Sequence, residues 1–154
     1  MQKFQGKYRI ETARAKWWDY SNEGDYFITI CTKNREHLFG YVQDDEMILN
    51  EYGKIVSDCW IDLPNHYHNI VLGEFQIMPN HIHCIVGVDN SKIINPDSDK
   101  KIHGVFEFMR ALKSFSSRRI NEKRNSKGVS NWQERFHDHI IRDEAEYNRI
   151  RNYI

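Results

Sequence analysis

The sequence predicts a mixed α+β fold that contains a strand hairpin and a long amphipathic helix. Two apolar runs, 70–78 and 81–88, flank Pro79-Asn80, a pair that suits a tight reversal between strands. Residues 105–124 instead repeat their apolar side chains at helical spacing. A chain of 154 residues is long enough for one proper hydrophobic core, so a single domain spanning 1–154 is the simplest expectation.

The N-terminal part combines a polar start with one strong strand pattern. We expect residues 1–22 to form an N-terminal arm, in which Trp17 and Trp18 either stack on nucleic-acid bases or pin the N-terminus to the body. The β-branched and aromatic run 26–32 predicts a central strand. A weaker strand is expected near 46–49, and a helix over 51–63 is expected to end at Pro64.

The C-terminal part predicts two helices and a short strand. A polar loop is expected over 89–101, and a strand over 136–142. In the helix over 105–124, spacing places one set of residues on the buried side: Val105, Phe108, Met109, Leu112 and Phe115. The opposite, polar side holds Arg110, Lys113, Ser117, Asn121 and Arg124. That side is either a surface that follows DNA phosphates or a plain solvated face.

The last helix is expected to begin after Asp143, with Glu146 completing a capping box. Tyr147, Ile150 and Ile154 fall within one arc of this helix and predict its buried stripe. Tyr153 falls on the flank, where a phenol can reach a cleft. We therefore expect Tyr147 to pack and Tyr153 to be exposed.

The triplet His81-Ile82-His83 is the strongest chemical signal in the chain. Side chains two apart on a strand point the same way, so the two imidazoles should stand side by side. The alternate residues, starting with Ile82 and Cys84, form an apolar row that must be buried. The pair is either half of a metal site or two half-buried histidines satisfied by backbone or water.

Composition limits the classes of function. Net charge is zero, yet residues 101–154 hold 12 Lys and Arg against 7 Asp and Glu, so a basic C-terminal third could meet phosphate. Three widely spaced cysteines lack metal-finger or redox spacing, which favours a reduced, cytoplasmic setting. No run is apolar enough for a membrane span, and the start is not typical of a signal peptide.

Taken in order, these residues resemble the REP-associated tyrosine transposases, part of the single-tyrosine HUH (IS200-like) transposases. The resemblance runs almost end to end. It is carried by Asp19-Tyr20-Ser21 with Gly24, the run from Tyr26 to Thr32, Asn34-Arg35, Leu49-Asn50 with Tyr52-Gly53, Met78-Pro79-Asn80-His81-Ile82-His83, Leu112-Lys113-Ser114, Trp132-Gln133, Asp138-His139-Ile140-Ile141-Arg142, and Arg149-Ile150-Arg151-Asn152-Tyr153-Ile154.

The resemblance implies a ferredoxin-like sandwich, an antiparallel sheet with helices packed on it. It also implies that His81 and His83 bind a divalent metal, Mg²⁺ or Mn²⁺, and that Tyr153 is the nucleophile. Such enzymes cleave single-stranded DNA near hairpins, leave a 5′-phosphotyrosine link, and rejoin strands. Charge, position and family likeness together suggest a set of DNA contacts: Arg110, Lys113, Arg118, Trp132 and Arg142.

The sequence leaves open the third metal ligand, the retention of catalysis and the number of subunits. Members of the family continue past the tyrosine, where an amide about one helical turn on completes the metal site, whereas this sequence ends at Ile154. The third ligand is therefore absent, comes from elsewhere, or belongs to a longer chain. A catalytically weak or inactive hairpin-binding protein, and a homodimer that exchanges tyrosines, are both compatible with the sequence. A histidine-triad nucleotide hydrolase is disfavoured, because Ile85 occupies the third alternating position.

Overall fold

The structure, a computed structural model, describes residues 23–93 and 102–154. The expected N-terminal arm, 1–22, and most of the expected loop 89–101 lie outside these ranges. The elements are β1 (Gly24–Cys31), β2 (Gly40–Gln43), β3 (Glu46–Leu49), α1 (Glu51–Asp62), β4 (Ile70–Met78), β5 (His81–Val88), α2 (Val105–Arg124), β6 (His137–Ile141) and α3 (Glu144–Tyr153), with short 3-10 turns at Lys33–Arg35, Leu63–Asn65 and Asn90–Lys92.

Four strands form one antiparallel sheet in the order β4-β5-β1-β6. The chain runs β1-α1-β4-β5-α2-β6 through this sheet, which is the split βαβ arrangement of a ferredoxin-like fold. The fold class expected from the sequence is confirmed. Residues Pro79 and Asn80 make the expected turn between β4 and β5, and this turn is fixed against the end of β1 because Asn80 accepts a hydrogen bond from the Thr32 amide.

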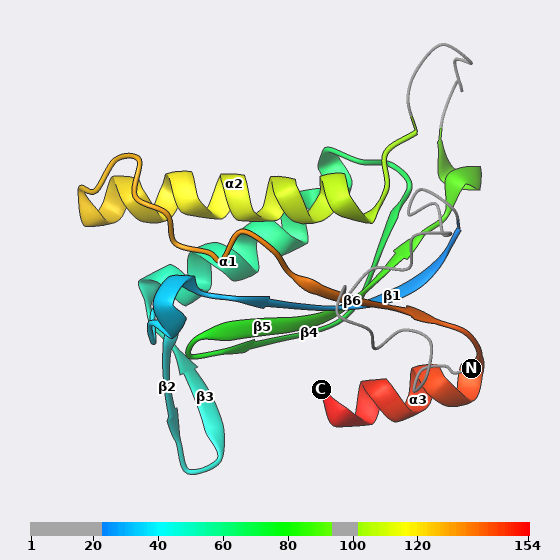
Figure 1. The fold of residues 1–154 in the computed structure, drawn as a ribbon, viewed down its shortest axis with the longest axis horizontal. Coiled ribbons are helices and arrows are strands. Elements are labelled where there is room, and N and C mark those ends of the chain that lie inside the picture. The colour runs from blue at the N-terminus through cyan, green and yellow to red at the C-terminus, as the bar shows by residue number, and fades with distance from the viewer. Residues whose placement is uncertain (1–22, 94–101) are drawn as a thin grey trace.

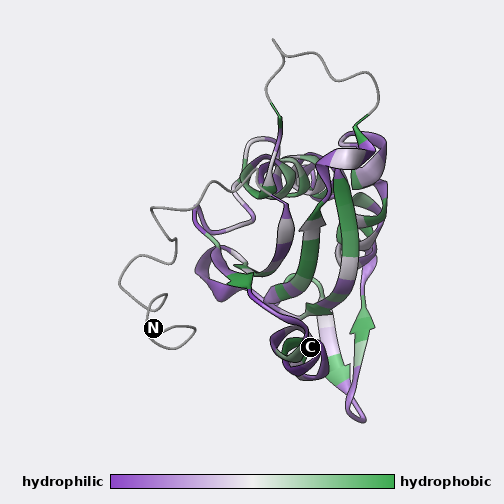
Figure 2. Ribbon diagram, turned by 90° about the vertical axis from the view of Figure 1, so that its right-hand side faces the viewer, coloured by the Kyte–Doolittle hydropathy of each residue, from purple (hydrophilic) through white to green (hydrophobic). Residues whose placement is uncertain are grey.

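The two long helices, α1 and α2, cover one face of the sheet, and α3 lies on the other (Figure 1). The main core fills the space between the sheet and the long helices. Figure 2 shows that much of the strands beneath these helices is hydrophobic (green). The sheet side of this core comes from alternate residues of the central strands: Tyr26, Ile28, Ile30, Ile82, Cys84 and Val86. The apolar row predicted for β5 is therefore buried, and its alternate positions face α3 instead.

The core under α3 is much smaller. Its buried members are Ile85, Ile141 and Ile150, with Phe27, Tyr147 and Ile154 packed around them. Tyr147 is partly buried and Tyr153 is 68% exposed, as the spacing of the last helix predicts. The helix that carries Tyr153 thus depends on few apolar contacts.

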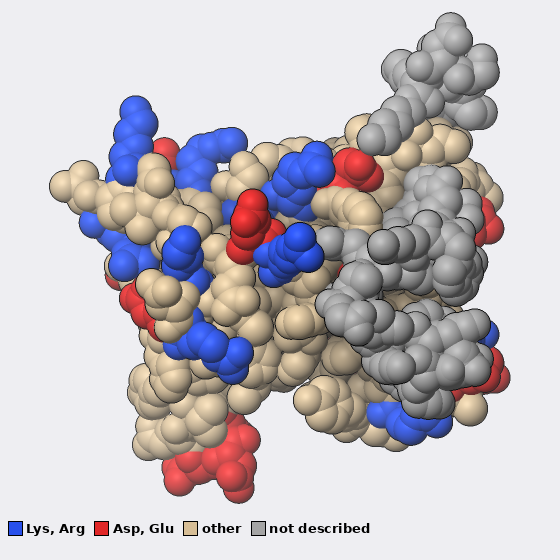
Figure 3. All heavy atoms as spheres, viewed as in Figure 1, with Lys and Arg blue, Asp and Glu red and all other residues tan. Residues whose placement is uncertain are grey.

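A two-stranded ribbon, β2 with β3, stands apart from the main sheet. The sequence indicated β3 and missed β2, because Tyr41 and Val42 are exposed and neither strand shows one buried face. The turn at its tip holds Asp44 and Asp45, both with positive φ. This tip is the acidic projection at the bottom of Figure 3.

Helix α2 has the expected bounds, but its polar side is not uniformly solvated. Asn121 is buried, and its side chain bonds to the Val129 carbonyl and to the Asn131 amide. The expectation of an exposed Asn121 was wrong because the segment after α2 folds back over the end of the helix. Among the helices of the described ranges, none has the length and apolarity needed to cross a membrane.

Candidate active site

His81 and His83 begin β5 and project from the face that α3 covers. Their ring centroids lie 4.7 Å apart, so the expected side-by-side pair is formed. Ile82, between them, is fully buried on the opposite face. Burial of this alternate row fixes which way the two imidazoles point.

Each imidazole is oriented by one hydrogen bond to its Nδ1 atom. In His81, Nδ1 lies 2.8 Å from Oδ1 of Asn80, and in His83 it lies 2.9 Å from Oγ1 of Thr29. The amide oxygen of Asn80 accepts only, so Nδ1 of His81 carries the proton and Nε2 keeps its lone pair. Tying down one ring nitrogen is how proteins orient a histidine that coordinates a metal through the other.

Burial keeps both imidazoles neutral. Loss of solvation, together with the smaller effect of neighbouring His81, lowers the pKa of His83 from 6.5 to about 4. Burial also lowers the pKa of His81, assisted by the positive charge of Arg35. Neutral imidazoles offer lone pairs at neutral pH, which is the form that binds metals.

Tyr153 lies on the last turn of α3, over the histidine pair. Its ring centroid is 5.6 Å from that of His83 and 6.2 Å from that of Phe27, to which it is almost perpendicular. Phe27 in turn stacks on His83 at 5.6 Å. Three residues that are far apart in sequence therefore form one aromatic cluster, in which the phenol is the exposed member.

A buried polar contact holds the start of α3 against β6. Asp143 caps the helix by accepting from the Glu146 amide, as expected. The Glu146 side chain, however, accepts from the Arg142 amide and lies 2.9 Å from Nε2 of His139. The expected reciprocal capping box was therefore wrong, because the carboxylate that should complete it is directed to β6 instead.

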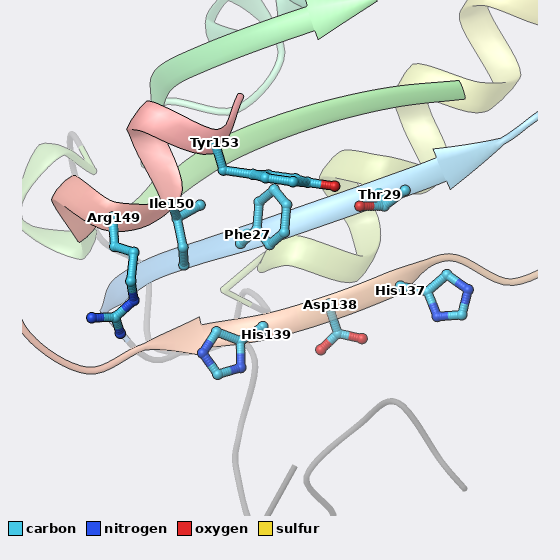
Figure 4. Close-up of a pocket in the computed structure, with 8 residues that line it drawn as sticks. All are labelled: Phe27, Thr29, His137, Asp138, His139, Arg149, Ile150 and Tyr153. Atoms are coloured by element: carbon cyan, nitrogen blue, oxygen red, sulfur yellow. The ribbon is translucent and has the colours of Figure 1, made fainter. Parts of the chain in front are cut away.

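A cavity of about 400 Å³ opens beside Tyr153, between α3 and β6. Figure 4 shows Tyr153, Ile150 and Arg149 above it and the side chains of β6 below. Phe27 and Thr29 of β1 form its floor, so the cavity and the histidine pair share two residues. Sequence reasoning missed the place of Phe27 and Thr29 in the site, because it depends on the pairing of β1 with β5.

The suggested DNA contacts fall in separate places. Arg110, Lys113 and Trp132 line a second cavity, of about 470 Å³, between α2 and residues 130–134. There Lys113 donates to the carbonyls of Gln133 and Glu134, while Trp132 is only 4% exposed and donates to Ser116. Figure 3 shows blue side chains spread from the middle of α2 to its C-terminal end.

The other two suggested contacts do not line that cavity. Arg118 lies over the ring of Phe115, and Arg142 is exposed at the junction of β6 and α3. The roles of all five residues in DNA binding stay predictions. Within 23–93 and 102–154, no group of three or more His, Cys, Asp or Glu side chains could hold a metal ion, so a third ligand stays unassigned.

Comparisons with known proteins identify the family of the chain and support its fold. The chain is 32% identical to an uncharacterised protein of Haemophilus influenzae (strain Rd), over 97% of this chain and 88% of the relative. Its fold is similar to that of a REP-associated tyrosine transposase bound to a REP hairpin (TM-score 0.57, 18% identity, 92% of this chain and 70% of that one). A Deinococcus radiodurans structure described as a candidate transposase is also similar (TM-score 0.54, 18% identity, 91% and 93%). Residues 20–154 match the sequence model described as "Transposase IS200 like", and the chain therefore belongs to the IS200-like transposase family.

Proposed function

We propose that this transposase cleaves and rejoins single-stranded DNA near hairpins, with Tyr153 as the nucleophile and His81 and His83 as ligands of a divalent metal. The observation that carries the proposal is the 5.6 Å separation between the rings of Tyr153 and His83. At that separation one DNA phosphate can touch both the phenol and a cation held by the imidazoles. Within the described ranges, Tyr153 is the only exposed tyrosine with a ring contact to either histidine, an edge-on contact with His83.

In the proposed step, Oη of Tyr153 attacks the phosphorus and the bond from phosphorus to the 3′-oxygen breaks. The departing 3′-oxygen takes up a proton, and the phenol gives up its own to water or to a base. The phosphotyrosine ester conserves the energy of the phosphodiester bond, so attack by a 3′-hydroxyl can rejoin strands without a nucleotide cofactor. A phenol with an ordinary pKa of ~10 needs help to ionise at neutral pH.

The histidine pair suits a metal with mixed nitrogen and oxygen ligands. Both rings are neutral and held at Nδ1, and with the proton on Nδ1 the Nε2 atom of each ring can coordinate a metal. When bound, Mg²⁺ or Mn²⁺ would act as a Lewis acid on the scissile phosphate. Two nitrogens alone are an incomplete shell for either ion, so the remaining positions call for oxygen ligands.

The proposed substrate is a single strand that carries a hairpin. A structural neighbour is described as bound to a REP hairpin, and the cavity lined by Arg110 and Lys113 offers this chain a basic surface of its own. Tyr153 and both histidines belong to one chain, so the proposal does not require a homodimer that exchanges tyrosines.

A hairpin-binding protein without catalysis is the second candidate. It is favoured because, among the described residues, no third His, Cys, Asp or Glu side chain joins the histidine pair to form a group that could hold a metal ion. This candidate predicts salt-sensitive hairpin binding with no covalent adduct under any metal.

One experiment separates the two candidates. The protein is incubated with hairpin-bearing single-stranded oligonucleotides and Mn²⁺, and a band shifted by covalently attached DNA is sought on a denaturing gel. The proposal expects an adduct with the native chain and with Tyr147→Phe, and none with Tyr153→Phe, which should still bind the hairpin. An adduct formed by Tyr153→Phe would show that another residue is the nucleophile.

A further inference from the structure

The cavity between α3 and β6 adjoins the proposed reaction centre and shares Tyr153 with it. Tyr153 forms one wall, and the floor residue Thr29 is the same residue that bonds Nδ1 of His83. A group that occupied this cavity would therefore lie beside the phosphate presented to Tyr153. The neighbours of that phosphate in a DNA strand are its two flanking nucleosides.

The lining combines flat apolar surfaces with a polar rim. Phe27 and Ile150 supply apolar contact area, and Figure 4 shows the Tyr153 ring extending over Phe27. His137 and Arg149, both exposed at the rim, supply side-chain nitrogens. An aromatic platform with a few polar groups around it is the usual environment in which proteins hold an unstacked nucleobase.

The size of the cavity suits a single base. Its volume of about 400 Å³ lies at the lower end of the ~300–1,000 Å³ of pockets that enclose small ligands. One planar base therefore fits in this space. An extended single strand, unlike a duplex, can turn one base out at low cost.

We propose that this cavity receives one nucleobase that directly flanks the scissile phosphate, and that its rim residues His137 and Arg149 read that base. The inference rests on the proposed function, because it assumes that DNA reaches Tyr153. It adds a selective step to that function: the base at one flanking position must leave the stack before its phosphate can reach the phenol.

A binding experiment tests the inference without requiring cleavage. In Tyr153→Phe, 2-aminopurine is placed in turn on each side of the scissile phosphate of a hairpin oligonucleotide. Fluorescence should rise on binding at one flanking position, because the analogue leaves its neighbours, and stay unchanged several nucleotides away. His137→Ala and Arg149→Ala should each reduce this rise, whereas Arg151→Ala, an exposed change on the same helix that does not line the cavity, should not.

A cleavage experiment gives the second measurement. Replacing that flanking nucleotide with an abasic analogue should slow adduct formation by at least about fivefold, the lower end for loss of one stacked base. The abasic analogue should slow adduct formation less in the His137→Ala, Arg149→Ala double variant than in the native protein. No fluorescence rise at either flanking position, or equal abasic penalties in native and double-variant proteins, would overturn the inference. If fluorescence rises but no adduct forms, the nucleophile proposal fails while the base site stands.

Discussion

Nε2 of His139 lies 2.9 Å from Oε2 of Glu146, and this buried contact joins β6 to the first turn of α3. Glu146 is 2% exposed although it carries a carboxylate. Its other oxygen accepts from the Arg142 amide, so both oxygens are satisfied by β6 or the residue that follows it. Because α3 has a small apolar core, this contact is a principal determinant of where Tyr153 lies.

Glu146→Ala should displace Tyr153, the proposed nucleophile, without weakening DNA binding. Loss of the contact lets α3 shift on the sheet, and a shift of about 1 Å can lower a rate by up to ~100-fold. Adduct yield over time and hairpin affinity are measured in parallel. Glu144→Ala, an exposed change in the same turn, is the control and should match the native protein. Glu146→Gln should recover part of the rate, since an amide can still bond to both partners.

His81→Ala with His83→Ala should remove the response of cleavage to divalent metal. Each substitution removes an Nε2 atom that the proposal assigns to metal coordination. Adduct formation is followed while Mn²⁺ or Mg²⁺ is titrated against a chelator. The matched control changes His66 and His68, another pair spaced by two that lies outside the strands. Cleavage by the His81, His83 double variant that still rises with Mn²⁺ would place the metal elsewhere.

Arg110→Ala should weaken hairpin binding by a salt-dependent amount. If its guanidinium contacts one phosphate, the slope of log affinity against log salt should fall by about 0.7 to 0.9. Affinity is measured at several salt concentrations. Arg119→Ala removes an equal charge from the same helix at a position that does not line the cavity, and should change the slope less. Equal slopes for the two variants would remove this surface from the DNA-binding proposal.

Trp132 is expected to contribute to the stability of the fold at least as much as to DNA binding. Its ring packs on Phe39 at 5.1 Å, and its Nε1 donates to Ser116. Trp132→Ala should lower the free energy of unfolding by about 3–5 kcal/mol, the usual cost of emptying a large aromatic site. Urea unfolding measures this, with Val129→Ala, at an exposed position, expected to stay within about 0.5 kcal/mol. A small loss for Trp132→Ala would contradict the packing role.

Stability should fall on acidification, partly through His139. Burial lowers the pKa of His139 below 6.5, although Glu146 beside it acts in the opposite direction, and Arg142 and Arg149 assist burial. Below about pH 6.5 the unfolded chain therefore binds more protons at this residue than the folded one, so folding is penalised there and not above. Urea unfolding at pH 7 and pH 5 should show a smaller acid-induced loss for His139→Gln. An unchanged loss would show that other groups control the pH dependence.

The sequence predicted the parts of this fold that depend on local pattern. Period-2 burial located β5 and the direction of its two histidines, and helical spacing separated exposed Tyr153 from packed Tyr147. What it missed depends on contacts between distant segments. Thr29 reaches His83 through the β1–β5 register, Glu146 turns away from its own helix to meet His139, and Asn121 is buried by the segment that follows α2.

Alternate residues of β5 point to opposite faces of the sheet and belong to two different layers. Ile82, Cys84 and Val86 belong to the large core under α1 and α2, while His81, His83 and Ile85 belong to the thin layer under α3. The main core shares no residue with the face that carries the two histidines. If the proposed chemistry holds, substitutions confined to that face can therefore abolish cleavage and still leave a folded protein.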